Sequence, residues 1–193
     1  MQTGDSLRLA LEAAYKAFSS VPFPRYLETS PLRDGGKILR TLAAAPLRHL
    51  TSEQVGPYAG WAITTVGSEM DYRHFLPRIL ELAVESPTHL GLMAPVIAGR
   101  ITLGNWIHWP ARQHDTVLEV FRTAFERAVE THPDEGLSAP EWLCGLAKLG
   151  CSIDAHLTFW RNSTSPNAAL QLALFARMAL EVMAGTGDRL AGC

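Results

Sequence analysis

The sequence lacks a strong charge of either sign and contains little cysteine. Its 17 basic and 19 acidic residues give a net charge of −2, with the seven histidines counted as neutral. Such a balance lacks the excess of basic residues that binding to nucleic acid or to an anionic membrane surface requires. The three cysteines (Cys144, Cys151 and Cys193) include no CxxC pair and are a poor basis for a disulfide framework. We therefore expect a cytoplasmic protein that binds neither nucleic acid nor membrane.

Long apolar runs are also missing. Charged residues interrupt the N-terminal apolar segment from Arg8 onward, too early for the core of a signal peptide. The longest apolar stretch, 168–184, is broken by Gln171, Arg177 and Glu181 and is shorter than the roughly 20 residues that a bilayer requires. Because this stretch is apolar nearly all round, we expect a central helix that neighbouring helices cover on several sides.

The common catalytic motifs are absent. The sequence contains neither of two phosphate-binding motifs, GxGxxG for dinucleotides and Walker A for nucleotides. It also lacks the GxSxG motif, which carries a serine nucleophile, and the HExxH motif, which binds zinc. Gly36-Lys37 lacks the glycine five positions earlier that a phosphate-binding loop requires, and Ile38 replaces its hydroxyl residue. These absences favour a protein without catalytic activity, and we expect no cofactor.

What the sequence does contain is a series of apolar residues at helical spacing. Hydrophobic residues make up 47% of the chain, enough for a sizeable core, and almost no segment alternates with the period of a strand. The predicted helices cover about 5–20, 37–45, 51–66, 68 to Pro87 with a kink or a new start at Pro77, 94–103, 110–131, 138–149, 153–162 and 165–185.

This pattern predicts an all-α fold. Short connections make successive helices pack antiparallel, so we expect one compact domain, 1–193, built from antiparallel helical hairpins, with a loose tail at 185–193. A short stack of hairpins, resembling a small α-solenoid, is the alternative architecture.

The densest group of charged side chains lies between Glu69 and Leu82. Arginine binds carboxylates and phosphates through two parallel hydrogen bonds, so this group is a candidate partner-binding surface. Its proposed contact residues are Asp71, Arg73, His74 and Arg78. The alternative is pairing within the chain, of Arg73 with Glu69 and of Arg78 with Glu81.

The same segment resembles one found in other proteins. The run DYRHFLPRILEL at 71–82 resembles a segment of uncharacterised bacterial helical proteins, which carry an acid-aromatic-Arg-x-Phe-Leu-Pro-Arg-Ile string. The tetrapeptide EWLC at 141–144 is similar to a sequence found in that setting, and the resemblance covers about a third of the chain. It implies a bacterial source and a helical fold. It implies no activity, because the family has none assigned.

Two tryptophans interrupt the helical pattern. Trp106 and Trp109 lie in a break between predicted helices, where aromatic side chains form either an exposed anchor for a partner or a plug that closes the end of the helical layers. We retain both residues as candidate partner contacts, beside the plug interpretation.

A His-Asp doublet is the only hint of metal chemistry. His114-Asp115 resembles the doublet of the HD-domain phosphohydrolases, in which histidine and aspartate hold a divalent metal that activates water. The competing interpretation is a solvated helix face, with Asp115 complementing the helix dipole.

Together these features predict a non-catalytic protein-binding module. The specific hypothesis is a bacterial immunity or adaptor protein that masks a toxin or effector. A metal-dependent phosphohydrolase that uses His114 and Asp115 is the enzymatic alternative, and a structural subunit of a larger complex is a third.

Overall fold

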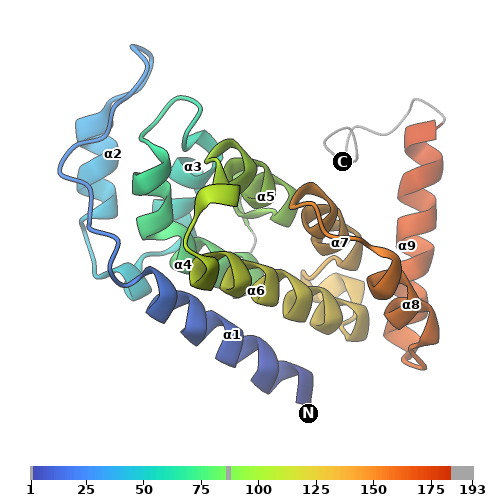
Figure 1. The fold of residues 1–193 in the computed structure, drawn as a ribbon. Helices are drawn as coiled ribbons and strands as arrows, with labels where there is room; N and C mark the ends of the chain where they lie inside the picture. The colour runs from blue at the N-terminus through green and yellow to red at the C-terminus, as the bar shows by residue number, and fades with distance from the viewer. Residues whose placement is uncertain (1, 86–87, 184–193) are drawn as a thin grey trace.

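The computed structural model describes residues 2–85 and 88–183, and throughout these ranges the fold is all-helical, as predicted (Figure 1). The described ranges contain nine α-helices and no strand, and their only β-type pairings are two isolated bridges. The helices are α1 (Gln2–Phe18), α2 (Gly35–Leu42), α3 (Ser52–Trp61), α4 (Glu69–Glu85), α5 (Ala94–Leu103), α6 (Ala111–Glu130), α7 (Ala139–Lys148), α8 (Asp154–Asn162) and α9 (Pro166–Met183).

Most helix boundaries follow the local signals in the sequence. The predicted bounds of α5 match those observed, and α7 begins after Ser138, whose hydroxyl accepts a hydrogen bond from the Glu141 amide. At the start of α3, Thr51 and Gln54 form the reciprocal capping box that their spacing indicates. Pro77 does not end α4, which continues through it to Glu85.

α3 is shorter than predicted, because the residues that follow it form hydrogen bonds with a distant segment of the chain. The helix ends at Trp61, and the following loop hydrogen-bonds to the connector before α2: Ser30 donates to the Thr65 carbonyl at 3.0 Å, and Gly67 donates to the Glu28 carbonyl at 2.7 Å. The spacing of apolar residues in 62–66 resembles a helix, but tertiary hydrogen bonds hold this segment in another conformation.

The helices pack out of chain order. α1 packs along α6 and also contacts α4, while α5 packs against α7 (Figure 1). In a solenoid each unit contacts only its neighbours in sequence. The long-range packing of α1 on α6 is instead the arrangement of a compact bundle, whose core runs from Leu7 in α1 to Ala168 in α9.

Backbone-to-backbone contact fixes the approach of α3 to the 3-10 turn Leu90–Leu92. A Cβ atom on Gly91 would lie 2.2 Å from the Gly56 carbonyl oxygen and 2.4 Å from the Gly60 amide nitrogen. No side chain fits in this space, so glycine is required at position 91 for the two backbones to meet.

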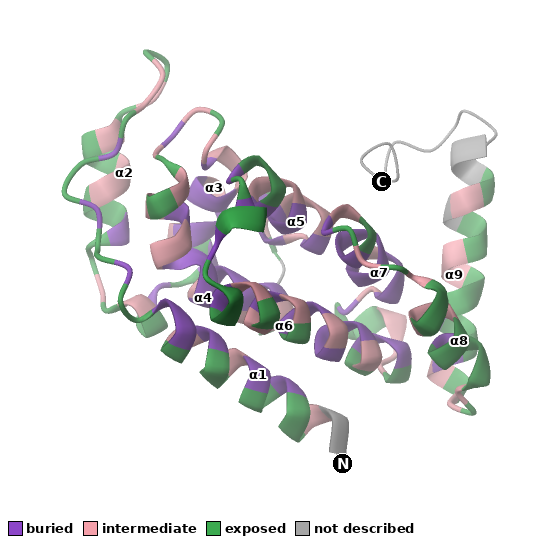
Figure 2. Cartoon of the chain, in the orientation of Figure 1, coloured by how far each residue is buried: buried purple, intermediate pink, exposed green. Residues whose placement is uncertain are grey.

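α9 lies at the edge of the molecule, and the expectation of a central helix was wrong. Figure 2 shows α9 mostly exposed or half-buried. Ala168 and Gln171 are buried, whereas Leu170, Leu172 and Leu180 are among the exposed large apolar side chains. Apolar composition correctly indicated a helix with more than one apolar face, but it did not indicate which parts of the chain cover those faces.

Two further expectations concern the chain ends and membranes. The predicted loose tail, 185–193, lies outside the described residues. Among the described helices, none combines the length and apolar character that crossing a bilayer requires.

Candidate functional site

Asp71 caps the helix that carries it. Its carboxylate accepts hydrogen bonds from the Ser68 amide at 2.7 Å and from the Ser68 hydroxyl at 2.8 Å. The Asp71 amide in turn donates to the Ser68 hydroxyl oxygen at 3.3 Å. This reciprocal pair satisfies groups that the first turn of α4 would otherwise leave unpaired.

Arg73 joins three helices. Its Nε and Nη2 donate to Oε1 of Gln113 on α6, at 3.1 and 2.6 Å, and Nη1 contacts Oε1 of Glu69 at 3.4 Å. The buried Gln113 then donates to the carbonyl of Ala17 on α1 at 3.1 Å. The predicted Arg73–Glu69 pair is present, and the rest of the guanidinium is engaged in packing α4 against α6.

His74 and Arg78 also contact other parts of the chain. His74 Nδ1 lies 2.9 Å from the Val21 carbonyl oxygen, and its ring packs edge-on against two phenylalanines. Arg78 donates through Nε to the Leu50 carbonyl at 2.8 Å and pairs with Glu81, as the intramolecular interpretation predicted. Glu81 also accepts a hydrogen bond from the Tyr15 hydroxyl at 2.5 Å, which connects this cluster to α1.

The two tryptophans are buried, at 5% exposure for Trp106 and 6% for Trp109. Trp109 donates through Nε1 to the Gly104 carbonyl at 3.0 Å, and its ring meets Phe18 edge-to-face. Trp106 stacks on His114, with ring centroids 4.1 Å apart and planes inclined by 10°. These contacts are those of the plug interpretation. Partner binding through Trp106, Trp109 and the charged cluster stays a prediction.

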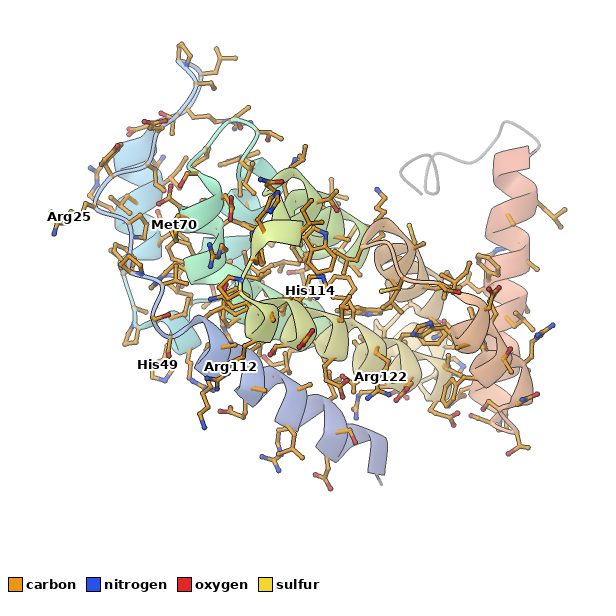
Figure 3. All side chains as sticks on the ribbon, viewed as in Figure 1. Arg25, His49, Met70, Arg112, His114 and Arg122 are labelled. Atoms are coloured by element: carbon orange, nitrogen blue, oxygen red, sulfur yellow. The ribbon has the colours of Figure 1, made fainter. Side chains whose placement is uncertain are left out.

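The histidine of the His-Asp doublet packs against another side chain of the protein. His114, which Figure 3 labels, is the residue stacked on Trp106. The Asp115 side chain is 79% exposed, and its Oδ1 lies 3.6 Å from His114 Nδ1. In the described part of the chain, no three histidine, cysteine, aspartate or glutamate side chains lie close enough together to hold a metal ion. No third ligand accompanies the doublet there, whereas catalytic zinc sites have three protein ligands.

Between α2 and α3 lies a groove that sequence reasoning missed. Its volume is about 390 Å³, within the range of ligand pockets. We call it the α2–α3 groove and define it by its lining residues: Leu32, Arg33, Asp34, Lys37, Ile38, Thr41, Glu53, Gln54, Pro57, Tyr58 and Trp61.

One wall of the α2–α3 groove is held in place by a cation–aromatic contact. The Arg33 guanidinium carbon lies 3.8 Å from the ring centroid of Trp61, and the Thr29 hydroxyl donates to the Arg33 carbonyl at 3.1 Å. At its rim, Leu32 is 92% exposed. An ordered cation therefore lies beside an apolar side chain that has no cover within the described chain.

The acidic residues of the groove have hydrogen-bond partners, whereas its basic residues have no carboxylate partner among the described residues. Asp34 accepts the Lys37 amide at 2.8 Å as the cap of α2, and a hydrogen bond from the Thr51 side chain lowers the pKa of Glu53. Arg33 and Lys37, by contrast, form no ion pair with any described residue. The groove thus offers two cations to an outside carboxylate, while its own carboxylates already have hydrogen-bond donors.

The segment that contributes α2 carries more basic than acidic residues. Residues 25–40 include four basic and two acidic residues, in a chain of net charge −2. Arg25 projects beyond the ribbon at the edge of the molecule beside α2 (Figure 3). This local excess of positive charge was the available sequence signal. It was missed because the basic residues of the whole chain were considered together.

Comparison with known proteins gives no relatives. No family model, curated protein or solved structure matches the chain.

Proposed function

We propose that this chain is a non-catalytic protein-binding module whose α2–α3 groove receives an acidic, apolar segment of a partner protein. The observation that carries the proposal is the pair of cations, Arg33 and Lys37, that lack a carboxylate within the described residues beside an apolar recess.

Complementary charge favours an acidic partner over a basic or neutral one. Electrostatic complementarity steers encounter and selects among partners, while burial of apolar side chains supplies most of the affinity. Arg33 is already stacked on Trp61, so less side-chain entropy is lost when it binds a carboxylate.

The apolar part of the groove defines the rest of the partner segment. Ile38 and Trp61 are half-buried and Leu32 is exposed, so a leucine or phenylalanine of the partner would cover all three. The finer proposal is that this partner is a toxin or effector and that the chain masks it as a cytoplasmic immunity or adaptor protein of a bacterium.

A peptide pair tests the groove directly. We expect an acidic leucine-containing peptide to shift backbone NMR resonances in 32–41 and 53–61, and a matched peptide with lysine in place of each acid to leave them unchanged. Raising the salt concentration to about 1 M, where the Debye length falls to about 3 Å, should weaken binding of the acidic peptide.

Two single charge reversals distinguish the groove from general electrostatic attraction. Lys37→Glu on α2 should weaken binding of the acidic peptide at least tenfold. Arg112→Glu makes the same change in charge on exposed α6 (Figure 3) and should have little effect. Equal losses in both variants, or no loss in either, would refute a binding site at the α2–α3 groove.

The finer proposal needs a biological measurement. Co-expression with the products of adjacent genes should reveal a toxic product that the wild-type chain neutralises and the Lys37→Glu variant does not. Neutralisation that survives Lys37→Glu would separate the immunity role from the groove.

A further inference from the structure

One face of α9 holds the helix to the rest of the molecule. The Gln171 side chain is fully buried, accepts the Ala139 amide at 3.1 Å, and donates to the carbonyls of Thr131 at 3.1 Å and Leu137 at 2.8 Å. On the same face, Ala168 accepts a hydrogen bond from the Trp160 indole, and Phe175 packs against that indole. These anchors all lie in the first ten residues of α9.

The opposite face of α9 is apolar and exposed. It carries the residues Ala169, Leu172, Ala173, Ala176 and Leu180, all exposed, which we call the α9 stripe. Their spacing of three and four residues places them on one side of a helix, away from Gln171. Leu172 is 39% exposed and Leu180 is 65% exposed. The stripe contains no charged residue, so it has the composition of a second buried face.

The α9 stripe is complementary to itself. Leu172 and Leu180 stand four residues before and four residues after Ala176. If two α9 helices cross antiparallel with a two-fold axis at Ala176, Leu172 of each copy lies opposite Leu180 of the other. Alanine at the crossing point allows the axes to approach to about 8 Å, the lower limit for packed helices.

We propose that the α9 stripe binds the α9 stripe of a second copy of this chain, in an antiparallel pair centred on Ala176. A two-fold interface uses the same patch on both subunits and therefore requires a self-complementary surface. Interfaces between identical subunits are also more apolar than other interfaces, and the uncharged leucines and alanines of the α9 stripe match that composition.

The size of α9 limits the strength of the pair. Its 18 residues extend over about 27 Å, so one helix pair buries less than the roughly 800 Å² per partner of a standard interface. We therefore expect a dimer that dissociates on dilution, with a dissociation constant on the order of micromolar.

The first measurement is the molar mass of the full chain in solution. Light scattering and sedimentation should show the mass rise from 21.1 kDa towards twice that value as the concentration increases through the micromolar range. A monomer at every concentration up to several hundred micromolar would overturn the proposal and assign the stripe to a different occupant.

A charge at the two-fold axis tests the geometry. Ala176→Glu places two carboxylates opposite each other and should shift the chain to monomer, weakening association at least tenfold, with unchanged helix content. Leu170→Glu introduces the same charge on an exposed position of α9 outside the stripe and should preserve the dimer. A dimer that persists in Ala176→Glu would overturn the proposal.

Mixing complementary variants distinguishes self-pairing from every other occupant of the stripe. Ala176→Glu and Ala176→Lys should each be monomeric alone and should form a heterodimer when mixed, because the axis then pairs opposite charges. Failure to restore association would refute a two-fold axis at Ala176. Leu180→Gln is a second variant, which should weaken the wild-type dimer at least tenfold even if a charged residue at 176 impairs folding.

Discussion

Single residues determine how closely the backbones of this protein approach. Gly91 is the clearest case, because the atoms that an added Cβ would meet are backbone atoms of α3 and cannot rotate away. Gly99, in the middle of α5, has nothing within 4 Å of its Cβ position. Position 91 therefore requires glycine, whereas position 99 has room for a side chain.

We predict opposite effects of alanine at these two glycines. Gly91→Ala should lower the free energy of unfolding by about 3 kcal/mol or more, because α3 must move away. Gly99→Ala should raise it by about 0.5–1 kcal/mol, because alanine restricts the unfolded chain and favours helix. Urea denaturation of both variants checks the prediction, and equal effects would contradict the close approach at Gly91.

Two buried hydroxyl groups lack hydrogen-bond partners among the described residues: those of Tyr58 and Tyr72. Burial raises the pKa of Tyr72 far above its ordinary value, so the hydroxyl stays neutral at any working pH. Tyr72→Phe removes a desolvated polar group and should leave stability unchanged or raise it by up to about 1 kcal/mol. Thermal unfolding measures the change, and a loss above 1 kcal/mol would indicate a partner such as a buried water.

The matched control for Tyr72 is Tyr15. Its hydroxyl donates to Glu81 at 2.5 Å. Tyr15→Phe should therefore cost about 1–2 kcal/mol, since hydrogen bonds to charged groups are the stronger class.

Glu12 provides a prediction about pH. Arg48 donates two hydrogen bonds to the Glu12 carboxylate, at 2.7 and 2.8 Å, and holds the pKa of Glu12 below its ordinary value. The resulting stabilisation is present above the unfolded pKa and is lost as the pH falls through the lower folded pKa. In an NMR titration, Arg48→Ala should raise the Glu12 midpoint towards the ordinary value for glutamate. An unchanged midpoint would contradict the pairing.

At the scale of helices, the Gln171 side chain joins α9 to the segment 131–139 through three hydrogen bonds. Replacing it by alanine leaves the buried Ala139 amide, the buried Leu137 carbonyl and the partly buried Thr131 carbonyl unpaired. We predict that Gln171→Ala costs about 2–4 kcal/mol and increases amide hydrogen exchange in α9 more than in α6. Leu170→Ala, exposed on the same helix, should change stability by less than about 0.5 kcal/mol.

Helix existence was predictable from the sequence, but the environment of each helix was not. Capping residues and apolar spacing act locally, so α5 and α7 were located well. The end of α3 depends on hydrogen bonds from the segment around Glu28, and the position of α9 depends on which helices reach it. The spacing of apolar residues within one segment predicts neither the end of α3 nor the position of α9.

The same limit applies to the candidate site. Local spacing correctly predicted the pairing of Arg73 with Glu69, but the stronger contact of Arg73 is Gln113, 40 residues away. The α2–α3 groove likewise depends on Arg33 reaching Trp61. These contacts form only when distant segments pack, so sequence reasoning identified the residue types and not their partners.

At the scale of the whole molecule, the two proposed surfaces lie at opposite edges, with α2 and α9 separated by the body of the bundle (Figure 1). Substitutions without shared contacts usually act independently. We predict that Lys37→Glu leaves the monomer–dimer equilibrium unchanged and that Ala176→Glu leaves acidic-peptide binding unchanged. Peptide titrations of each variant at fixed protein concentration measure this, and reciprocal effects would reveal coupling across the bundle.

The packing of α1 along α6 has a consequence during synthesis on the ribosome. The apolar face of α1, with Leu7, Ala14 and Phe18, can meet α4 once Glu85 has been translated, but its packing along α6 is complete only after Glu130. At about 5–20 residues per second, that interval is on the order of 10 s. Throughout it, the nascent chain presents an amphipathic helix that lacks its α6 neighbour, which is the kind of segment that chaperones bind.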